Sequence, residues 1–179
     1  MRGTVLAALA LVSLGLLGCI GNGTGEAVTT LLADPADVIA AGSVVPVDGV
    51  TSSGQPDEAA LEVYARPGYA AVIDIRTAKE PRGMDDERAV VEGLGMDYVL
   101  LPIRGSDGIT FENAAALDKL IDSYDAPVLV HCGSGNRVGA LLALAKASEG
   151  MDDEQALEYG REAGMTRLEG AVRKALDDD

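Results

Sequence analysis

Short, uninterrupted apolar segments that alternate with helical segments are the feature that most restricts how this chain can fold. The clearest of them, Tyr69 to Ile75, shows no polar residue until Asp74, which is typical of a strand buried on both faces of a parallel sheet. Further strands are expected over Ser43–Val50, Tyr98–Ile103 and Val128–His131. The sequence therefore predicts an α/β fold with a mainly parallel central sheet of about four to five strands flanked by helices.

Helices are expected between the strands because apolar residues recur there at helical spacing and capping residues mark the ends. The expected helices cover Asp57–Ala65, Asp85–Leu94, Thr110–Tyr124 and Arg137–Glu149, and residues 51–56 are expected to form a turn. Two capping boxes, Asp152 with Gln155 and Thr166 with Glu169, predict that the C-terminal part is helical as well.

The N-terminal residues have the pattern of an export signal. Arg2 precedes an uncharged stretch, Gly3 to Gly18, that is rich in Leu, Ala and Val and has the length of a secretory signal rather than of a membrane span. It ends in Leu16-Leu17-Gly18-Cys19, which resembles the lipobox of bacterial lipoproteins. An ordinary cleaved signal with an incidental cysteine is the alternative.

These observations predict three parts of the chain. Residues 1–18 are expected to be a lipoprotein signal peptide, and residues 19–43 a flexible tether that is anchored by a lipid on Cys19. Residues 44–179 are then the α/β domain. Ile20 after the cysteine favours the outer membrane in a Gram-negative host, with the domain facing the periplasm.

Charge and size exclude several classes of function. The chain has 179 residues, which suffice for one sizeable core but not for two ordinary domains. Its 29 acidic and 14 basic residues give a net charge of -15. Such a chain repels nucleic acids and anionic membrane surfaces, so a nucleic-acid partner is not expected.

Cys132 is the residue that most needs an explanation. If Cys19 carries a lipid, Cys132 is the only thiol left in the mature protein, and no intramolecular disulfide can form. The single histidine, His131, is its direct neighbour on a strand and points to the opposite face, which disfavours a papain-like triad. One histidine and one cysteine cannot build a tetrahedral zinc site by themselves, so neither a metal nor an organic cofactor is expected.

The carboxyl ends of the expected strands carry the polar groups. In open α/β sheets the functional crevice lies beyond these ends, and three of them finish in Arg76, Arg104 and Cys132. Because the chain is acidic, local arginines must attract an anionic substrate, and Arg76, Arg82 and Arg104 are candidates. For Arg82 an ordinary surface salt bridge is the alternative.

The segment after Cys132 predicts an anion-binding loop. It leads from a strand into a helix, where backbone N–H groups and the positive end of the helix dipole can hold an anion. The same field favours a nucleophilic thiolate at Cys132, and the planar guanidinium of Arg137 can clamp two anion oxygens. His131 is expected to be a buried donor that orients this loop. The loop residues are Gly133, Ser134, Gly135 and Asn136.

Three motifs together resemble the phosphatase-like domain family known from beta-lactamase hydrolase-like proteins, whose fold is similar to that of dual-specificity protein phosphatases. The motifs are Ser53-Gly54-Gln55-Pro56, Val72-Ile73-Asp74-Ile75-Arg76 and the segment from His131 to Arg137, and the similarity covers about Val44 to Arg173. The resemblance implies that Cys132 attacks phosphorus, that the loop amides and Arg137 hold the oxygens, and that a loop aspartate protonates the leaving group. Asp107 is the candidate for that acid, with a plain turn residue as the alternative.

One departure from the phosphatases keeps other functions open. Only four residues separate Cys132 from Arg137, one fewer than in those phosphatases, and this length resembles the loop of rhodanese sulfurtransferases. Asp74 to Glu80 also resembles the strand end of that fold. The favoured function is hydrolysis of a small phosphorylated substrate through a phosphocysteine. The alternatives are sulfur transfer through a Cys132 persulfide and a non-catalytic module that binds anions at the envelope.

Overall fold

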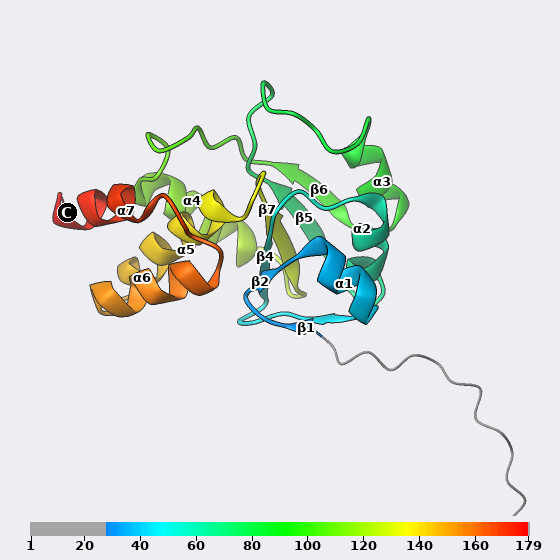
Figure 1. Ribbon diagram of the computed structural model, residues 1–179, viewed down its shortest axis with the longest axis horizontal. Helices are drawn as coiled ribbons and strands as arrows, with labels where there is room; N and C mark the ends of the chain where they lie inside the picture. The colour runs from blue at the N-terminus through cyan, green and yellow to red at the C-terminus, as the bar shows by residue number, and fades with distance from the viewer. Residues whose placement is uncertain (1–27, 179) are drawn as a thin grey trace, which may run out of the picture.

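A parallel five-stranded sheet forms the centre of the molecule, as the computed structural model shows for residues 28–178 (Figure 1). The strands follow the order β2–β4–β7–β5–β6, and every pair is parallel. A separate two-stranded parallel sheet pairs β1 with β3. The predicted parallel α/β fold is therefore confirmed. The strands are β1 (Val28–Thr29), β2 (Leu32–Ala33), β3 (Val44–Val45), β4 (Val50–Ser53), β5 (Ala71–Asp74), β6 (Asp97–Leu100) and β7 (Val128–His131).

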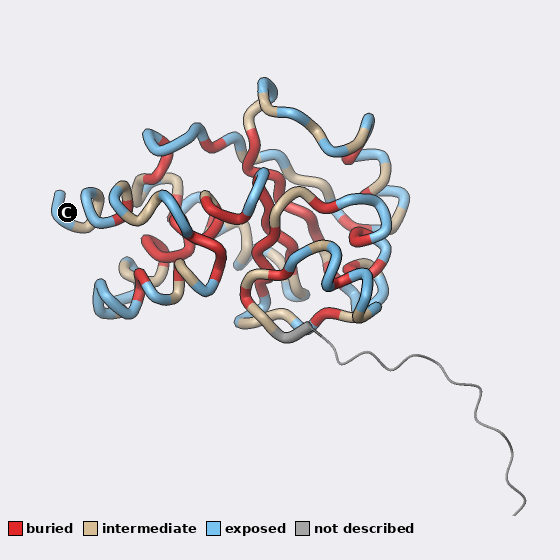
Figure 2. The backbone as a smooth tube through the Cα atoms, in the orientation of Figure 1, coloured by how far each residue is buried: buried red, intermediate tan, exposed pale blue. Residues whose placement is uncertain are grey.

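Helices cover both faces of the sheet because the two central strands are apolar on both. Val72 and Leu129 pack into the core beneath α1 to α3, whereas Ile73 and Val130 pack into the core on the side of α4 to α7. Figure 2 shows the inner strands of the sheet buried between these layers, and every residue of β4, β5 and β7 is buried. The helices are α1 (Pro35–Ala41), α2 (Glu58–Ala65), α3 (Glu87–Gly93), α4 (Phe111–Ile121), α5 (Asn136–Ser148), α6 (Asp153–Glu162) and α7 (Glu169–Asp177).

Strand β4 corrects the prediction of a turn at residues 51–56. Its side chains are polar but buried, and each hydroxyl finds a partner. Thr51 Oγ1 lies 2.6 Å from the hydroxyl oxygen of Tyr69, Ser52 donates to the carbonyl of Ala163, and Ser53 donates to that of Ala33. Because these bonds replace those to water, hydroxyl side chains can occupy a buried strand.

Two other expectations differ from the structure. The predicted strand Tyr98–Ile103 is present as β6, but its predicted burial and C-terminal end are wrong, because β6 is an edge strand that ends at Leu100, which is 40% exposed. Residues 28–43 are part of the fold instead of a flexible tether, because β2 pairs with β4 and Asp34 caps α1. The predicted signal peptide and Cys19 lie outside the described residues.

The C-terminal helices pack closely against α5. A Cβ atom on Gly139 would lie 2.4 Å from the carbonyl oxygen of Gly160, so glycine permits the close approach of α5 and α6. Asp152 is the N-cap of α6 as predicted, but it accepts the N–H of Glu154 rather than forming the predicted capping box with Gln155. The predicted capping box of Thr166 with Glu169 is wrong, because the Thr166 N–H donates to Asn136 instead and α7 has Leu168 at its N-cap. Among residues 28–178, no helix is long and apolar enough to cross a membrane.

Candidate functional site

Cys132 lies where β7 passes into α5, at the carboxyl edge of the sheet. The loop residue Gly135 occupies the N-cap of α5 with φ 78°, a left-handed conformation that favours glycine. A Cβ atom there would also lie 2.8 Å from Leu32 Cδ1. The Cys132 side chain is buried with 2% exposure. The sequence therefore builds a tight turn directly after the thiol, and α5 begins at Asn136.

A cavity of about 450 Å³ opens over this loop. That volume is within the range of small-molecule sites. Four parts of the chain form its wall: the cysteine loop itself, the segment after β5, the segment after β6 and the connection between α6 and α7. The lining residues are Glu80, Gly105, Ser106, Cys132, Gly133, Ser134, Asn136, Arg137, Arg167 and Leu168.

Arg137 is held in this cavity by Glu80. Its Nη1 donates to Glu80 Oε1 and to the carbonyl oxygen of Ile103, both at 2.8 Å, and Nη2 donates to Glu80 Oε2. The Nε–H has no hydrogen-bond partner among the described residues. The edge formed by Nε and Nη2 thus keeps donors for a ligand, in the geometry that suits two oxygens of one anion.

Electrostatics fix the charges of this pair. Burial alone would lower the pKa of Arg137, but the hydrogen bonds to Glu80 and the nearby charge of Cys132 outweigh burial and raise it. The hydrogen bonds from Arg137 lower the pKa of Glu80 despite its partial burial. Both groups are therefore ionised at neutral pH, and Glu80 is a poor candidate for a proton donor.

The upstream motif at Ser53 to Pro56 contacts the cysteine loop directly. Gly54 forms an isolated β-bridge with Ser134, and the Cys132 N–H donates to the carbonyl oxygen of Ser53 at 3.4 Å. Gln55 donates to the carbonyl oxygen of Pro56 at 3.0 Å. The end of β4 therefore holds the cysteine loop through backbone contacts.

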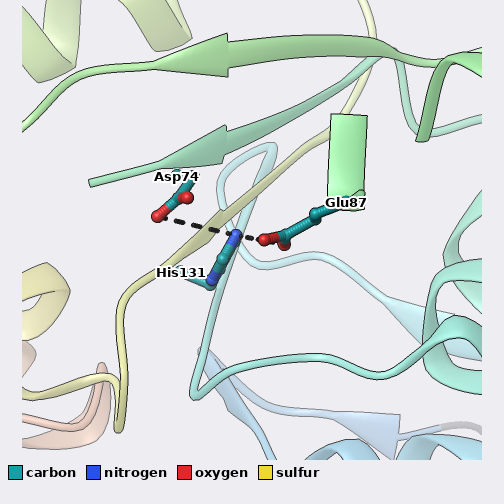
Figure 3. Close-up of side chains that lie close together, drawn as sticks. All are labelled: Asp74, Glu87 and His131. Atoms are coloured by element: carbon teal, nitrogen blue, oxygen red, sulfur yellow. Dashed lines mark ion pairs between the residues drawn. The ribbon is translucent and has the colours of Figure 1, made fainter. Parts of the chain in front are cut away.

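A cluster of buried charges lies beneath the loop (Figure 3). His131 Nε2 is 2.9 Å from Glu87 Oε1 and 4.0 Å from Asp74 Oδ1, and its Nδ1 is 3.3 Å from the Cys132 carbonyl oxygen. Arg76 lies against both carboxylates: Nε and Nη2 donate to the two oxygens of Asp74 at 2.9 Å, and Nη2 also donates to Glu87. His131 is thus buried and contacts the backbone of the loop residue Cys132, as predicted.

The pKa values show that the two carboxylates of the cluster, Asp74 and Glu87, are ionised. Burial alone would raise the pKa of Asp74, but hydrogen bonds from Arg76 and the adjacent His131 lower it to about 2. The pKa of Glu87 is also lowered, because His131 and Arg76 outweigh its burial. Asp74, Glu87 and His131 offer ligand atoms within 4.8 Å of one another. Arg76, however, pairs with both carboxylates and Arg82 pairs with Asp74, so two guanidinium charges already neutralise the two carboxylates without a metal ion.

Several predicted anion-binding residues lie elsewhere. The prediction that Arg76 binds an anion is wrong, because Arg76 is 1% exposed and hydrogen-bonded to Asp74 and Glu87. Arg104 is exposed and does not line the cavity, although Gly105 and Ser106, which follow it, do. Arg82 forms a salt bridge, as its alternative predicted, but with the buried Asp74 instead of a surface carboxylate.

Asp107 lies beside the cavity rather than in its wall. It borders a second cavity of about 490 Å³ that adjoins the first, because Ser106 lines both. Phe111, Ala171 and Lys174 line this second cavity as well.

Sequence reasoning missed Glu80 and Arg167. Glu80 is 57 positions from its partner Arg137, and Arg167 reaches the cavity only because the connection between α6 and α7 folds back over the loop. The N–H of Arg167 donates to Asn136 Oδ1 at 2.9 Å, and so does that of Thr166 at 2.7 Å. Glu80 belongs to the segment Asp74 to Glu80, which resembles the strand end of the rhodanese fold, so this resemblance could have pointed to it. No motif near Arg167 indicates a role in the site.

Comparisons with known proteins agree with this geometry. Residues 44–149 match the family described as "Beta-lactamase hydrolase-like protein, phosphatase-like domain". A Beta-lactamase hydrolase-like protein of Xylella fastidiosa is 35% identical over 113 residues, which are 60% of this chain and 26% of that protein. The chain therefore spans about a quarter of the length of the curated relatives it matches.

Solved structures share the fold. A candidate phosphatase of Neisseria meningitidis superimposes with a TM-score of 0.61 at 23% identity, covering 70% of this chain and 92% of that one. TpbA of P. aeruginosa, a variant of which was solved in complex with pTyr, superimposes with a TM-score of 0.53 at 18% identity, covering 72% and 86% of the two chains. At these identities the likeness concerns the fold.

Proposed function

Because the chain belongs to the phosphatase-like domain family of beta-lactamase hydrolase-like proteins, we propose that it hydrolyses phosphomonoesters through a covalent phosphocysteine at Cys132. The observation that carries the proposal is what lines the cavity: a cysteine, the loop that leads into the start of α5, and an arginine whose Nε–H has no partner within residues 28–178. These are the parts that phosphoryl transfer from an ester to a thiolate requires.

In the first step the Cys132 thiolate attacks phosphorus, an S–P bond forms, and the bond from phosphorus to the ester oxygen breaks. The loop amides and the free edge of Arg137 hold the phosphoryl oxygens, where charge develops in the transition state. In the second step water attacks phosphorus, the S–P bond breaks, and inorganic phosphate and the thiolate are released. Glu80 keeps Arg137 in place throughout, since it holds the opposite edge of the guanidinium.

We propose Asp107 as the acid that protonates the leaving group. Glu80 is unsuited because Arg137 lowers its pKa, and Asp107 follows Ser106, which lines the cavity. Hydrolysis of an alkyl phosphate needs such a proton more than hydrolysis of a nitrophenyl phosphate, whose leaving group is stable as an anion. Asp107→Asn should therefore slow the alkyl ester much more than the nitrophenyl ester, and equal slowing would argue against this role.

Sulfur transfer is the second candidate, and the short loop favours it. Four residues between Cys132 and Arg137 enclose a small ring of amides, which suits a persulfide. In that reaction the Cys132 thiolate takes a sulfane sulfur from a donor such as thiosulfate, with release of sulfite, and passes it to an acceptor such as cyanide.

A parallel assay separates the two reactions. Wild type and Cys132→Ser are offered a nitrophenyl phosphate and, separately, thiosulfate with cyanide. Phosphate release that depends on Cys132 supports the proposed hydrolysis, whereas thiocyanate formation alone that depends on Cys132 contradicts it. Binding of phosphate without either turnover would favour the non-catalytic module.

We also propose that the domain is attached to the cell envelope through a lipid on Cys19. The support is the apolar segment that ends in Leu16-Leu17-Gly18-Cys19. Metabolic labelling with a fatty acid should mark wild type but not Cys19→Ser. Equal labelling of both, or of neither, would contradict the anchor.

A further inference from the structure

The cavity over Cys132 is lined by a second arginine, Arg167, in addition to the ion pair of Arg137 with Glu80. Four of its lining residues can carry charge: Glu80, Cys132, Arg137 and Arg167. Glu80 is paired with Arg137, so these two charges compensate each other. Arg167 is then the cation that offsets the thiolate and attracts an anion. Its position matters because the chain carries a net charge of -15 and repels anions at long range.

The backbone of Arg167 is tied to the anion-binding loop. Asn136 is 8% exposed and is the first residue of α5, and its Oδ1 accepts the N–H groups of both Thr166 and Arg167. Leu168, which follows, also lines the cavity. The arginine is therefore fixed relative to Cys132 and Arg137 by the loop that holds them, although it comes from a distant part of the sequence.

The side chain of Arg167 is free to bind a ligand. It is exposed, and no carboxylate among residues 28–178 forms an ion pair with it. The two neighbouring arginines of the C-terminal helices differ: Arg161 pairs with Glu158 and Glu169, and Arg173 pairs with Glu154 and Glu169. The carboxylates of Glu154, Glu158 and Glu169 are thus paired with these two arginines.

We propose that Arg167 binds a second anionic group of the substrate, beside the phosphoryl group held by the loop and Arg137. The inference rests on the proposed hydrolysis and names its substrate class: phosphomonoesters that carry a further phosphate or carboxylate. The loop amides and the Nε edge of Arg137 already supply donors for the phosphoryl oxygens. The cavity of about 450 Å³ is also larger than a phosphoryl group, which is about the size of a few water molecules and occupies roughly 100 Å³. Space therefore remains for a second group of the substrate.

Selectivity between two esters tests the proposal. The ratio of kcat/KM for a carboxyphenyl phosphate to that for phenyl phosphate is measured for wild type, Arg167→Gln and the control Arg66→Gln. Arg66 is an exposed arginine on the other side of the sheet, at the end of α2, and lines no part of the cavity. A hydrogen-bonded charge pair predicts that Arg167→Gln lowers this ratio about tenfold, and that Arg66→Gln leaves it as in wild type.

Binding separates this inference from the proposed reaction. Calorimetry with Cys132→Ser, alone and combined with Arg167→Gln, compares pyrophosphate with inorganic phosphate, so no turnover is needed. A preference for pyrophosphate that Arg167→Gln removes supports the second anion site even if the enzyme proves not to be a hydrolase. An unchanged preference, or an unchanged kcat/KM ratio in an active enzyme, overturns the role of Arg167 and leaves the hydrolysis standing.

Discussion

Two regions on either side of β7 combine arginine with glutamate, and they use the pair differently. Beneath the loop, Arg76 is 1% exposed and bonded to Asp74, Glu87 and the carbonyl oxygen of Pro81. Above it, Arg137 bonds Glu80 and a carbonyl but keeps its Nε–H without a partner in the described part of the chain. The neighbours His131 and Cys132 face these two regions in turn, as successive residues of a strand do.

The difference shows how burial separates support from binding. A charge removed from water must be neutralised by fixed partners, so the buried cluster can position the loop but cannot accept a ligand. A charge at the wall of a cavity can leave one edge unbonded, because water satisfies that edge until a ligand arrives. Arg76 is therefore a structural residue, whereas Arg137 is the one that we propose binds the substrate.

Loss of the guanidinium fork at Arg137 should have the largest effect on activity. Arg137→Lys keeps the charge but removes the planar edge that holds two oxygens. We expect kcat/KM for phenyl phosphate to fall about 10³-fold, or about 4 kcal/mol, in steady-state assays. Arg66→Lys is the control and should match wild type. A loss below about tenfold would mean that the free edge does not contact the transition state.

Breaking the buried cluster should instead act on stability. Asp74→Asn leaves Arg76 and Arg82 facing a neutral amide, and we expect the free energy of unfolding in urea to fall by about 3 kcal/mol. Asp85 is exposed, so Asp85→Asn should change it by less than about 0.5 kcal/mol. Equal effects of the two substitutions would show that the cluster is not a supporting element.

Acid should weaken the same cluster in a defined range of pH. The pKa of Asp74 is lowered to about 2 in the folded chain, from its ordinary value of 3.8. Its contribution is therefore present above pH 4 and lost as pH falls through about 2. The loss is about 2 kcal/mol. Urea titrations at several pH values should show the stabilities of wild type and Asp74→Asn converging over this range. Curves that stay parallel would contradict the assigned pKa.

Glu80→Gln should have a smaller effect, because an amide can still accept one hydrogen bond from Arg137. We expect kcat/KM to fall about tenfold, since the guanidinium is held less firmly. The exposed Glu62→Gln is the matched control. If Glu80→Gln raised the activity, Glu80 would compete with the substrate for Arg137 instead of orienting it.

The sequence predicts the parts of the site that are local in the chain. One short segment contains strand β7, the left-handed Gly135 and the start of α5. The local sequence pattern therefore suffices to predict them. It does not predict which arginine is buried. Arg76 and Arg104 both follow strand ends, but only tertiary packing brings Glu87 to one and leaves the other in solvent.

The missed elements depend on contacts between distant segments. Glu80 meets Arg137 across 57 positions, and Asn136 meets Arg167 across 31. The sequence predicts a turn in place of strand β4 because Ser and Thr are typical turn residues. The buried acceptors of these hydroxyls, such as the carbonyl oxygen of Ala163, belong to other segments. Local pattern thus reveals the nucleophile and its loop, while folding selects the charged residues around them.

The most direct test is the identity of the group that Cys132 carries during turnover. The wild-type chain is mixed with excess nitrophenyl phosphate, quenched rapidly in denaturant, digested and analysed by mass spectrometry, with thiosulfate in a parallel sample. The structure predicts one phosphoryl group on the peptide that contains Cys132 and none on that of Cys132→Ser. A sulfane sulfur on Cys132 from thiosulfate, with no phosphoryl group from the ester, would contradict hydrolysis through a phosphocysteine.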